Sequence, residues 1–131
     1  MFIDASAICA ILLNEADADD LTAKLIAAPS RYTSAIAVFE TVRALMRVLG
    51  VEPAVARATV ARFLNAAEID FVSIGEAERE AALDAMGRFG KGRHPARLNM
   101  GDCFAYACAR TRGVVLLVKG DDFSRTDIVP A

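Results

Sequence analysis

The sequence has few of the residues that build zinc centres and disulfide frameworks. It contains a single histidine, His94, and three cysteines, and no two cysteines form a C-x-x-C pair. Zinc sites combine cysteine and histidine ligands at short, regular spacings. The three cysteines, Cys9, Cys103 and Cys108, lie in apolar segments with helical spacing, which is typical of reduced, buried thiols in a cytosolic protein. The sequence therefore argues against a zinc protein and against a disulfide-stapled one.

Long apolar runs and a leader segment are also lacking. The apolar run at residues 5–13 is nine residues long, whereas a helix that spans a membrane needs about 20. No basic leader precedes this run, and Asp4 stands directly before it, so a secretory signal is not predicted. No internal repeat, low-complexity tract or linker divides the 131 residues. We expect a single cytoplasmic domain over residues 1–131, without membrane contact.

Global charge and the common catalytic motifs give little guidance. The net charge of −2 excludes a chain that is basic throughout, although positive charge can still gather locally. The G-x-S-x-G, P-loop and G-x-G-x-x-G motifs are absent. The sequence thus offers neither a recognisable nucleophile motif nor a glycine-rich phosphate loop.

What the sequence does contain is a regular alternation of short apolar strands with helical patterns. Strands are predicted up to Asp4 and at residues 31–33, 69–72 and 114–118, with a short edge strand at 128–129. Helices are predicted between them, and the longest of these helices cover residues 35–49, 53–65 and 99–112, with another that starts between 73 and 76 and ends near 89–90. Such alternation predicts an α/β fold with a parallel sheet that is covered by helices on both faces.

Capping residues mark several of the predicted helix boundaries. Ser34 and Asn99 are of the residue types that favour the N-cap position. Pro53 stands where a proline in the first helical turn belongs. Gly50 and Gly113 follow the last apolar residues of two helices and are expected to end them.

Acidic residues gather at one edge of the predicted sheet. Asp4 ends the first strand, and Asp121 and Asp122 follow the strand at 114–118. Glu40 and Asp102 lie in the first two turns of helices that leave the same edge. The carboxyl ends of parallel strands share one edge, and ligands commonly bind there.

Each of these acids also has an ordinary structural explanation. Asp4 can cap the following helix, Asp102 can complete a capping pattern, and Asp121 and Asp122 can be turn residues. Glu40 can be a solvated residue on its helix. Four separate segments nevertheless place an acid at one edge, and crowded carboxylates repel one another unless a cation binds them. An all-oxygen site favours Mg²⁺ or Mn²⁺, and such a site suits hydrolysis at phosphorus by an activated water.

Several segments match the pattern of a known family, in the expected order. They are F-I-D-A-S-A at 2–7, the helix from Ser34 to Glu40-Thr41, G-K-G-R-H at 90–94, L-N-M-G-D-C-F-A-Y-A at 98–107, and L-L-V-K-G-D-D-F at 116–123 with T-D-I at 126–128. Through these segments the chain resembles PIN-domain ribonucleases, and more narrowly the VapC toxins of bacterial toxin–antitoxin pairs. The N-x-G-D-C-F-x-Y-A and K-G-x-D-F segments together are the most specific part of the resemblance.

The resemblance implies a fold, an activity and partners. The fold is a three-layer α/β/α PIN-like arrangement with a short, mostly parallel central sheet of four or five strands. The activity is that of a Mg²⁺-dependent endoribonuclease toxin, with Mn²⁺ as a substitute cofactor. The implied partners are RNA, a cognate VapB-type antitoxin whose tail blocks the acidic pocket, and a second copy of the chain in a homodimer.

The resemblance also assigns roles to residues. Catalytic and metal-binding roles fall to four acids, which are Asp4, Glu40, Asp102 and Asp122. Asp121 is adjacent to Asp122, and the pattern does not separate the two. Ser6 matches the small hydroxyl residue that follows the first acid and is expected to donate a hydrogen bond to it. Asn99 is expected to support Asp102 from the helix cap.

The loop before the last long helix has an unusual, basic composition. Lys91, Arg93, His94 and Arg97 fall within seven residues and are flanked by glycines. Charged loops are ordinarily just solvated, but an acidic protein that cleaves RNA needs a local positive patch. We therefore expect Lys91, Arg93 and Arg97, together with Lys119, to contact RNA phosphates.

Two alternatives to a ribonuclease stay open at the level of sequence. A phosphoacceptor receiver module also combines an α/β fold, an acidic pocket, Mg²⁺ and a late lysine such as Lys119. It requires an acceptor aspartate near the middle of the chain, and residues 47–53 contain none. The other alternative is a binding protein that keeps the PIN fold without catalysis, against which the complete acid set argues. The apolar helix at 35–49 and its neighbour at 53–65 are the predicted contact face for a dimer partner or an antitoxin.

Overall fold

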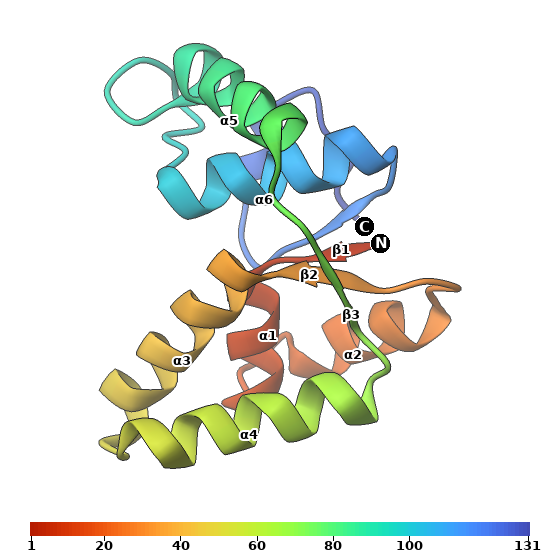
Figure 1. The fold of residues 1–131 in the computed structure, drawn as a ribbon, viewed down its shortest axis with the longest axis vertical. Coiled ribbons are helices and arrows are strands. Elements are labelled where there is room, and N and C mark those ends of the chain that lie inside the picture. Colours follow the sequence, from red (N-terminus) through yellow and green to blue (C-terminus); the bar gives the residue numbers. More distant parts are fainter.

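The computed structural model describes residues 1–131 and confirms the alternation of strands and helices (Figure 1). The strands are β1 (Phe2–Ile3), β2 (Tyr32–Ser34), β3 (Asp70–Val72) and β4 (Leu116–Leu117). The helices are α1 (Ala5–Leu12), α2 (Ala18–Ala27), α3 (Ala35–Leu49), α4 (Pro53–Ala66), α5 (Glu76–Phe89) and α6 (Met100–Arg112). A 3-10 helix, η1 (Asp122–Arg125), follows β4. None of the helices combines the length and apolar composition that crossing a membrane requires.

The sheet is short and fully parallel. Its strand order is β3-β2-β1-β4, so β1 lies between β2 and β4. Phe2 of β1 pairs with Tyr32 on one side and with Leu116 on the other, and every pairing is parallel. Because all four strands run the same way, their carboxyl ends meet at one edge. This arrangement confirms the predicted α/β/α fold with four strands.

Two apolar cores pack against the two faces of the sheet. Helices α1 to α4 cover one face, and α5 and α6 cover the other (Figure 1). Ile3 and Leu117 belong to the core under α1 to α4, whereas Phe2 and Leu116 belong to the core under α5 and α6. Successive strand residues point to opposite faces, so β1 and β4 each contribute one residue to each core. The position of Asp4 is thereby fixed from both sides.

The predicted caps are present. The side chains of Ser34 and Asn99 accept hydrogen bonds from the backbone N–H groups three residues later, at 3.3 and 3.1 Å. Pro53 is the first residue of α4. Gly50 and Gly113 both have a φ of 64°, the left-handed conformation that ends a helix and that glycine adopts most easily.

The strand predicted at residues 114–118 is longer than the strand that forms. Only Leu116 and Leu117 are in β4, because its partner β1 also has two residues and offers no further ladder. The predicted edge strand at 128–129 is reduced to an isolated parallel bridge between Leu116 and Pro130. The Leu116 N–H donates to the carbonyl oxygen of Val129 at 3.1 Å.

One carboxylate fastens the C-terminal segment to α5 and α6. Asp127 accepts hydrogen bonds from the Tyr106 hydroxyl at 2.7 Å, from Arg88 at 2.8 Å and from Arg110 at 3.1 Å. Burial acts to raise the pKa of Asp127, but the hydrogen bonds from Tyr106 and Arg88 and the charges of Arg88 and Arg110 lower it to about 2. Since Asp127 follows η1 closely, this network also holds η1 beside the end of β4.

Candidate active site

Asp4 lies at the carboxyl end of β1 and is almost completely buried, with 5% of its surface exposed. It is the N-cap of α1, and its Oδ2 accepts hydrogen bonds from the backbone N–H of Ser6 at 2.9 Å and from the Ser6 hydroxyl at 2.6 Å. Both bonds reach the same oxygen, so Oδ1 accepts no hydrogen bond. The capping explanation for Asp4 is therefore correct, and it leaves one carboxylate oxygen for another partner.

Ser6 joins the ends of two neighbouring strands. Its hydroxyl donates to Asp4, and the same oxygen accepts the backbone N–H of Lys119 at 3.0 Å. Asp4 follows β1 and Lys119 lies two residues beyond β4, so this hydroxyl fixes the spacing between the two chain segments. The structure thus contains the hydrogen bond that was expected of Ser6.

Asp102 lies in the first turn of α6 and forms a reciprocal cap with Asn99. The Asn99 backbone N–H donates to Oδ2 of Asp102 at 2.8 Å, and the Asp102 N–H donates to Oδ1 of Asn99 at 3.1 Å. Burial raises the pKa of Asp102 to about 6; the Asn99 hydrogen bond opposes this, and the charges of Asp4 and Asp122 add to it. As in Asp4, one carboxylate oxygen caps a helix and the other accepts no hydrogen bond.

Glu40 reaches the same region from α3. Burial raises its pKa above the ordinary range, and the charges of Asp4 and Asp102 raise it further, whereas Arg43 lowers it. Its carboxylate lies against Gly101 in α6. The side chain is only partly exposed, so the solvated-residue explanation that the sequence permitted for Glu40 is incomplete.

The structure separates Asp121 from Asp122. Both are exposed, and η1 begins at Asp122. Asp122 is close enough to Asp102 to raise its pKa, and Asp121 is not among the groups that do so. The backbone carbonyl of Asp121 instead accepts hydrogen bonds from the Ser124 N–H at 3.1 Å and the Ser124 hydroxyl at 2.6 Å. Of the two, only the charge of Asp122 reaches Asp102, whereas Asp121 has a turn role. Asp122 as the fourth acid stays a prediction.

The four acids lie around one region, but their carboxylates do not converge on a single position. In this conformation no three His, Cys, Asp or Glu side chains are grouped so that they could hold one metal ion. The charges of these acids nevertheless act on one another, as the raised pKa values of Glu40 and Asp102 show. Like charges repel one another, and the side chains of the exposed Asp122 and the partly exposed Glu40 have space to move away from the other acids. The metal-binding role of the four acids stays a prediction.

Comparison with known proteins identifies the family. A family model of the PIN domain matches residues 1–129. A VapC ribonuclease of Rhizobium meliloti is 40% identical over 97% of this chain and 98% of its own length. Ribonuclease VapC30 of Mycobacterium tuberculosis is 39% identical over 98% of this chain and 95% of its own length. The chain belongs to the VapC group of PIN-domain proteins.

Solved structures agree with this membership at the level of fold. The VapC20 toxin of Mycobacterium tuberculosis, described as a toxin that cleaves the sarcin–ricin loop, superposes with a TM-score of 0.77 over 99% of this chain and 97% of that one, at 21% identity. A toxin–antitoxin complex from Klebsiella pneumoniae gives a TM-score of 0.71 at 14% identity, with 99% of this chain and 95% of that chain covered. Membership of the PIN-domain family argues against the receiver-module alternative.

The basic loop of this PIN domain is ordered by its own backbone. The N–H of Leu98 donates to Phe89 and that of Lys91 donates to Leu98, both at 3.0 Å, which closes the loop. Nδ1 of His94 accepts a hydrogen bond from the Ala96 N–H at 3.1 Å, so the His94 side chain stabilises the loop internally. The exposed side chains Lys91, Arg93 and Arg97 line an open pocket.

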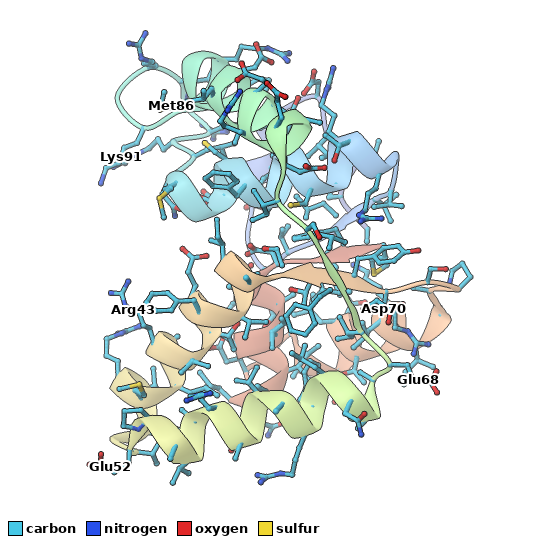
Figure 2. All side chains as sticks on the ribbon, viewed as in Figure 1. Arg43, Glu52, Glu68, Asp70, Met86 and Lys91 are labelled. Atoms are coloured by element: carbon cyan, nitrogen blue, oxygen red, sulfur yellow. The ribbon has the colours of Figure 1, made fainter.

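Positive side chains flank the acids on one side of the molecule. Figure 2 shows Lys91 of the basic loop and Arg43 of α3 on the same side of the molecule. In this view the first turns of α3 and α6 lie at heights between these two residues. Arg43 was not anticipated from the sequence. The sequence spacing could have indicated it, since residues three apart on a helix are neighbours and Arg43 stands three positions after Glu40.

Lys119 has partners that were not anticipated. Its ammonium group forms an ion pair with Glu15 and lies 3.9 Å from Oδ1 of Asp17. The hydrogen bond from Lys119 to Glu15 raises the pKa of Lys119 above its ordinary range. An RNA phosphate would have to compete with two carboxylates for this lysine, which makes it the weakest of the four predicted RNA contacts.

Proposed function

We propose that this protein is a metal-dependent endoribonuclease that acts as the toxin of a toxin–antitoxin pair. The observation that carries the proposal is the acid cluster: Asp4, Glu40, Asp102 and Asp122 come from four separate segments, and their charges act on one another at one edge of the sheet. Relatives that match nearly the whole chain are named ribonucleases, and one structural relative is a toxin–antitoxin complex.

The donor set suits a hard divalent cation. The donors are carboxylate oxygens, which Mg²⁺ and Mn²⁺ prefer, and Asp4 and Asp102 each have one oxygen free of hydrogen bonds. In this proposal Asp4, Asp102 and Asp122 would hold Mg²⁺, with Mn²⁺ as a substitute, and Glu40 would assist. When bound, such a cation supplies an activated water and polarises the phosphoryl oxygen.

Residues around the acids have supporting roles in the proposed reaction. Ser6 and Asn99 hold Asp4 and Asp102 in place through hydrogen bonds of 2.6 and 2.8 Å. Glu40 orients the attacking water and accepts its proton, since a carboxylate with a raised pKa is a better base near neutral pH than an ordinary one. The hydrogen bonds from Ser6 and Asn99 fix the direction of Asp4 and Asp102, and this proposed mechanism needs no histidine base.

RNA binding is assigned to the basic loop. Lys91, Arg93 and Arg97 are exposed, and the loop that carries them leads directly into the start of α6 where Asp102 lies. Contacts with phosphates provide affinity and orientation rather than sequence choice. Lys119 contributes only if it leaves Glu15.

The proposal extends to location and partners. We propose that the protein works in the cytoplasm as a homodimer and that a VapB-type antitoxin inhibits it. Apolar side chains of α3 and α4 that remain exposed, including Phe39, Val48 and Val55, support the prediction that this face contacts a partner. Val38, Val42, Val60 and Leu64 line a groove between the two helices.

The experiment that tests the enzymatic proposal compares Asp4→Asn with a matched control, Asp19→Asn. The amide can still accept the Ser6 hydrogen bonds, so the fold is preserved while the charge is removed. We expect Asp4→Asn to lower RNA cleavage more than about 100-fold, because even groups that only support metal ligands typically matter by about 10–100-fold. Asp19 is exposed in α2 and its variant should cleave normally.

The controls separate the enzyme from the binding-protein alternative. Cleavage by the wild type should disappear with EDTA and return with Mg²⁺ or Mn²⁺. Growth arrest on expression of the chain, relieved by co-expression of the adjacent upstream gene, tests the toxin assignment. Full activity of Asp4→Asn, or wild-type cleavage that persists in EDTA, would refute the assigned site.

A further inference from the structure

We propose that Gly101 is a positioning residue for Glu40, because only glycine leaves room for the Glu40 carboxylate against α6. The inference rests on the proposed function, in which Glu40 assists hydrolysis. Gly101 is buried in the first turn of α6, directly before Asp102. A Cβ built on Gly101 would lie 2.5 Å from the carboxyl carbon of Glu40 and closer still to both carboxylate oxygens.

The Glu40 carboxylate therefore occupies the space that any other side chain at position 101 would take. Glu40 belongs to α3 and Gly101 to α6, so this contact sets how two separate helices share the acid cluster. From this position Glu40 is close enough to Asp4 and Asp102 to be affected by both charges. The absence of a side chain at position 101 thus lets α3 place its acid in the cluster.

An alanine at position 101 would displace Glu40 rather than α6. Ordinary contact with a Cβ begins near 3.4 Å, so the carboxyl carbon would have to move by about an ångström. Glu40 is the flexible partner, because its carboxylate is the free end of a partly exposed side chain and can swing towards solvent. A misplacement of about 1 Å at a reacting centre can lower a rate on the order of 100-fold.

The substitution should not weaken the fold. Gly101 is in a helix and does not have a positive φ, so alanine can adopt its backbone conformation. Alanine is also the better helix former. Gly87 provides a matched control, since it lies within α5 and a Cβ built on it meets nothing within 4 Å.

The experiment compares Gly101→Ala with Gly87→Ala, each alone and in a Glu40→Ala background. Both single variants should melt at or above the wild-type temperature. Gly87→Ala should keep the wild-type kcat, whereas Gly101→Ala should lower kcat about 100-fold with little change in KM, because the RNA-binding loop is untouched. In the Glu40→Ala background, Gly101→Ala should cause no further decrease. Without RNA or metal, the ¹³C resonance of the Glu40 carboxyl group should shift in Gly101→Ala and not in Gly87→Ala.

Each other outcome has a definite meaning. The inference is overturned if Gly101→Ala has the kcat of Gly87→Ala, or if it lowers kcat equally with and without Glu40. If Gly101→Ala does not fold, the double variant with Glu40→Ala must fold, and its failure to do so overturns the inference. If the wild type does not cleave RNA, the proposed function fails, and the carboxyl resonance still decides the positioning role.

Discussion

Asp102→Asn should make the protein more stable while it removes activity. Asp102 has a pKa of about 6 in the folded protein, against an ordinary value of 3.8. The folded state therefore binds more protons than the unfolded state between these two values, so the free energy of unfolding falls as the pH rises through that window. Above it, the ionised Asp102 destabilises the fold by up to about 3 kcal/mol, and solvent screening of this partly exposed group reduces the figure to about 2 kcal/mol.

The amide variant keeps the cap and removes only the charge. The Asn side-chain oxygen can accept the Asn99 N–H that Asp102 now accepts at 2.8 Å. We therefore expect Asp102→Asn to gain about 2 kcal/mol at pH 8 in metal-free buffer, and the gain should shrink between about pH 6 and pH 4. Urea denaturation of both proteins at pH 8, 6 and 4 measures this directly.

Asp19→Asn is the matched control for the charge change itself. Asp19 is exposed in the first turn of α2, where a negative charge is mildly stabilising, so its removal should cost about 0.3–1 kcal/mol. The reasoning is refuted if Asp102→Asn is no more stable than the wild type at pH 8. It is also refuted if a gain exists but is the same at pH 4.

Two further predictions concern the framework and the RNA contacts. Tyr106→Phe removes the 2.7 Å hydrogen bond from the hydroxyl of a fully buried tyrosine to Asp127, and should lower the free energy of unfolding by about 1–3 kcal/mol in urea denaturation. An unchanged value would show that Asp127 holds the C-terminal segment through the arginines alone. Arg93→Ala should weaken binding of single-stranded RNA in a titration at several salt concentrations, and the slope of log K against log salt should become shallower by about 0.7, because one phosphate is no longer neutralised. Arg62→Ala, on α4, should leave that slope unchanged, and equal slopes for both variants would contradict an RNA role for the loop.

Much of the fold could be predicted from the sequence because its boundaries carry local signals. The helix predicted at 35–49 has the bounds of α3, since a Ser34 cap begins it and a left-handed Gly50 ends it. The strand predicted at 114–118 was too long because strand length depends on the partner. Val115 is apolar but exposed; its carbonyl oxygen accepts the Phe2 N–H at 2.9 Å, but β1 has no further residue to extend the ladder to it.

The sequence predicts the acids of the candidate site, but not how they are arranged. The edge that they share follows from strand direction, which the alternation of elements already implied. The choice between Asp121 and Asp122 depends on how η1 turns after β4, and no local pattern encodes that turn. The pairing of Lys119 with Glu15 and the contact of Glu40 with Gly101 arise from packing between segments that are distant in sequence.

The same side chains cap helices and carry the proposed chemistry, and these two roles do not compete. In Asp4 and Asp102 one carboxylate oxygen accepts the capping hydrogen bond and the other accepts none. Capping fixes the direction of the side chain, so each proposed cation ligand is oriented before any cation binds. The energetic consequence is the one measured by Asp102→Asn: an acid held in this cluster opposes folding until its charge is matched. With a cation bound, Asp102→Asn should therefore lower the free energy of unfolding instead of raising it. At pH 8 the free energy of unfolding of the wild type should rise with Mg²⁺, and that of Asp102→Asn should rise less.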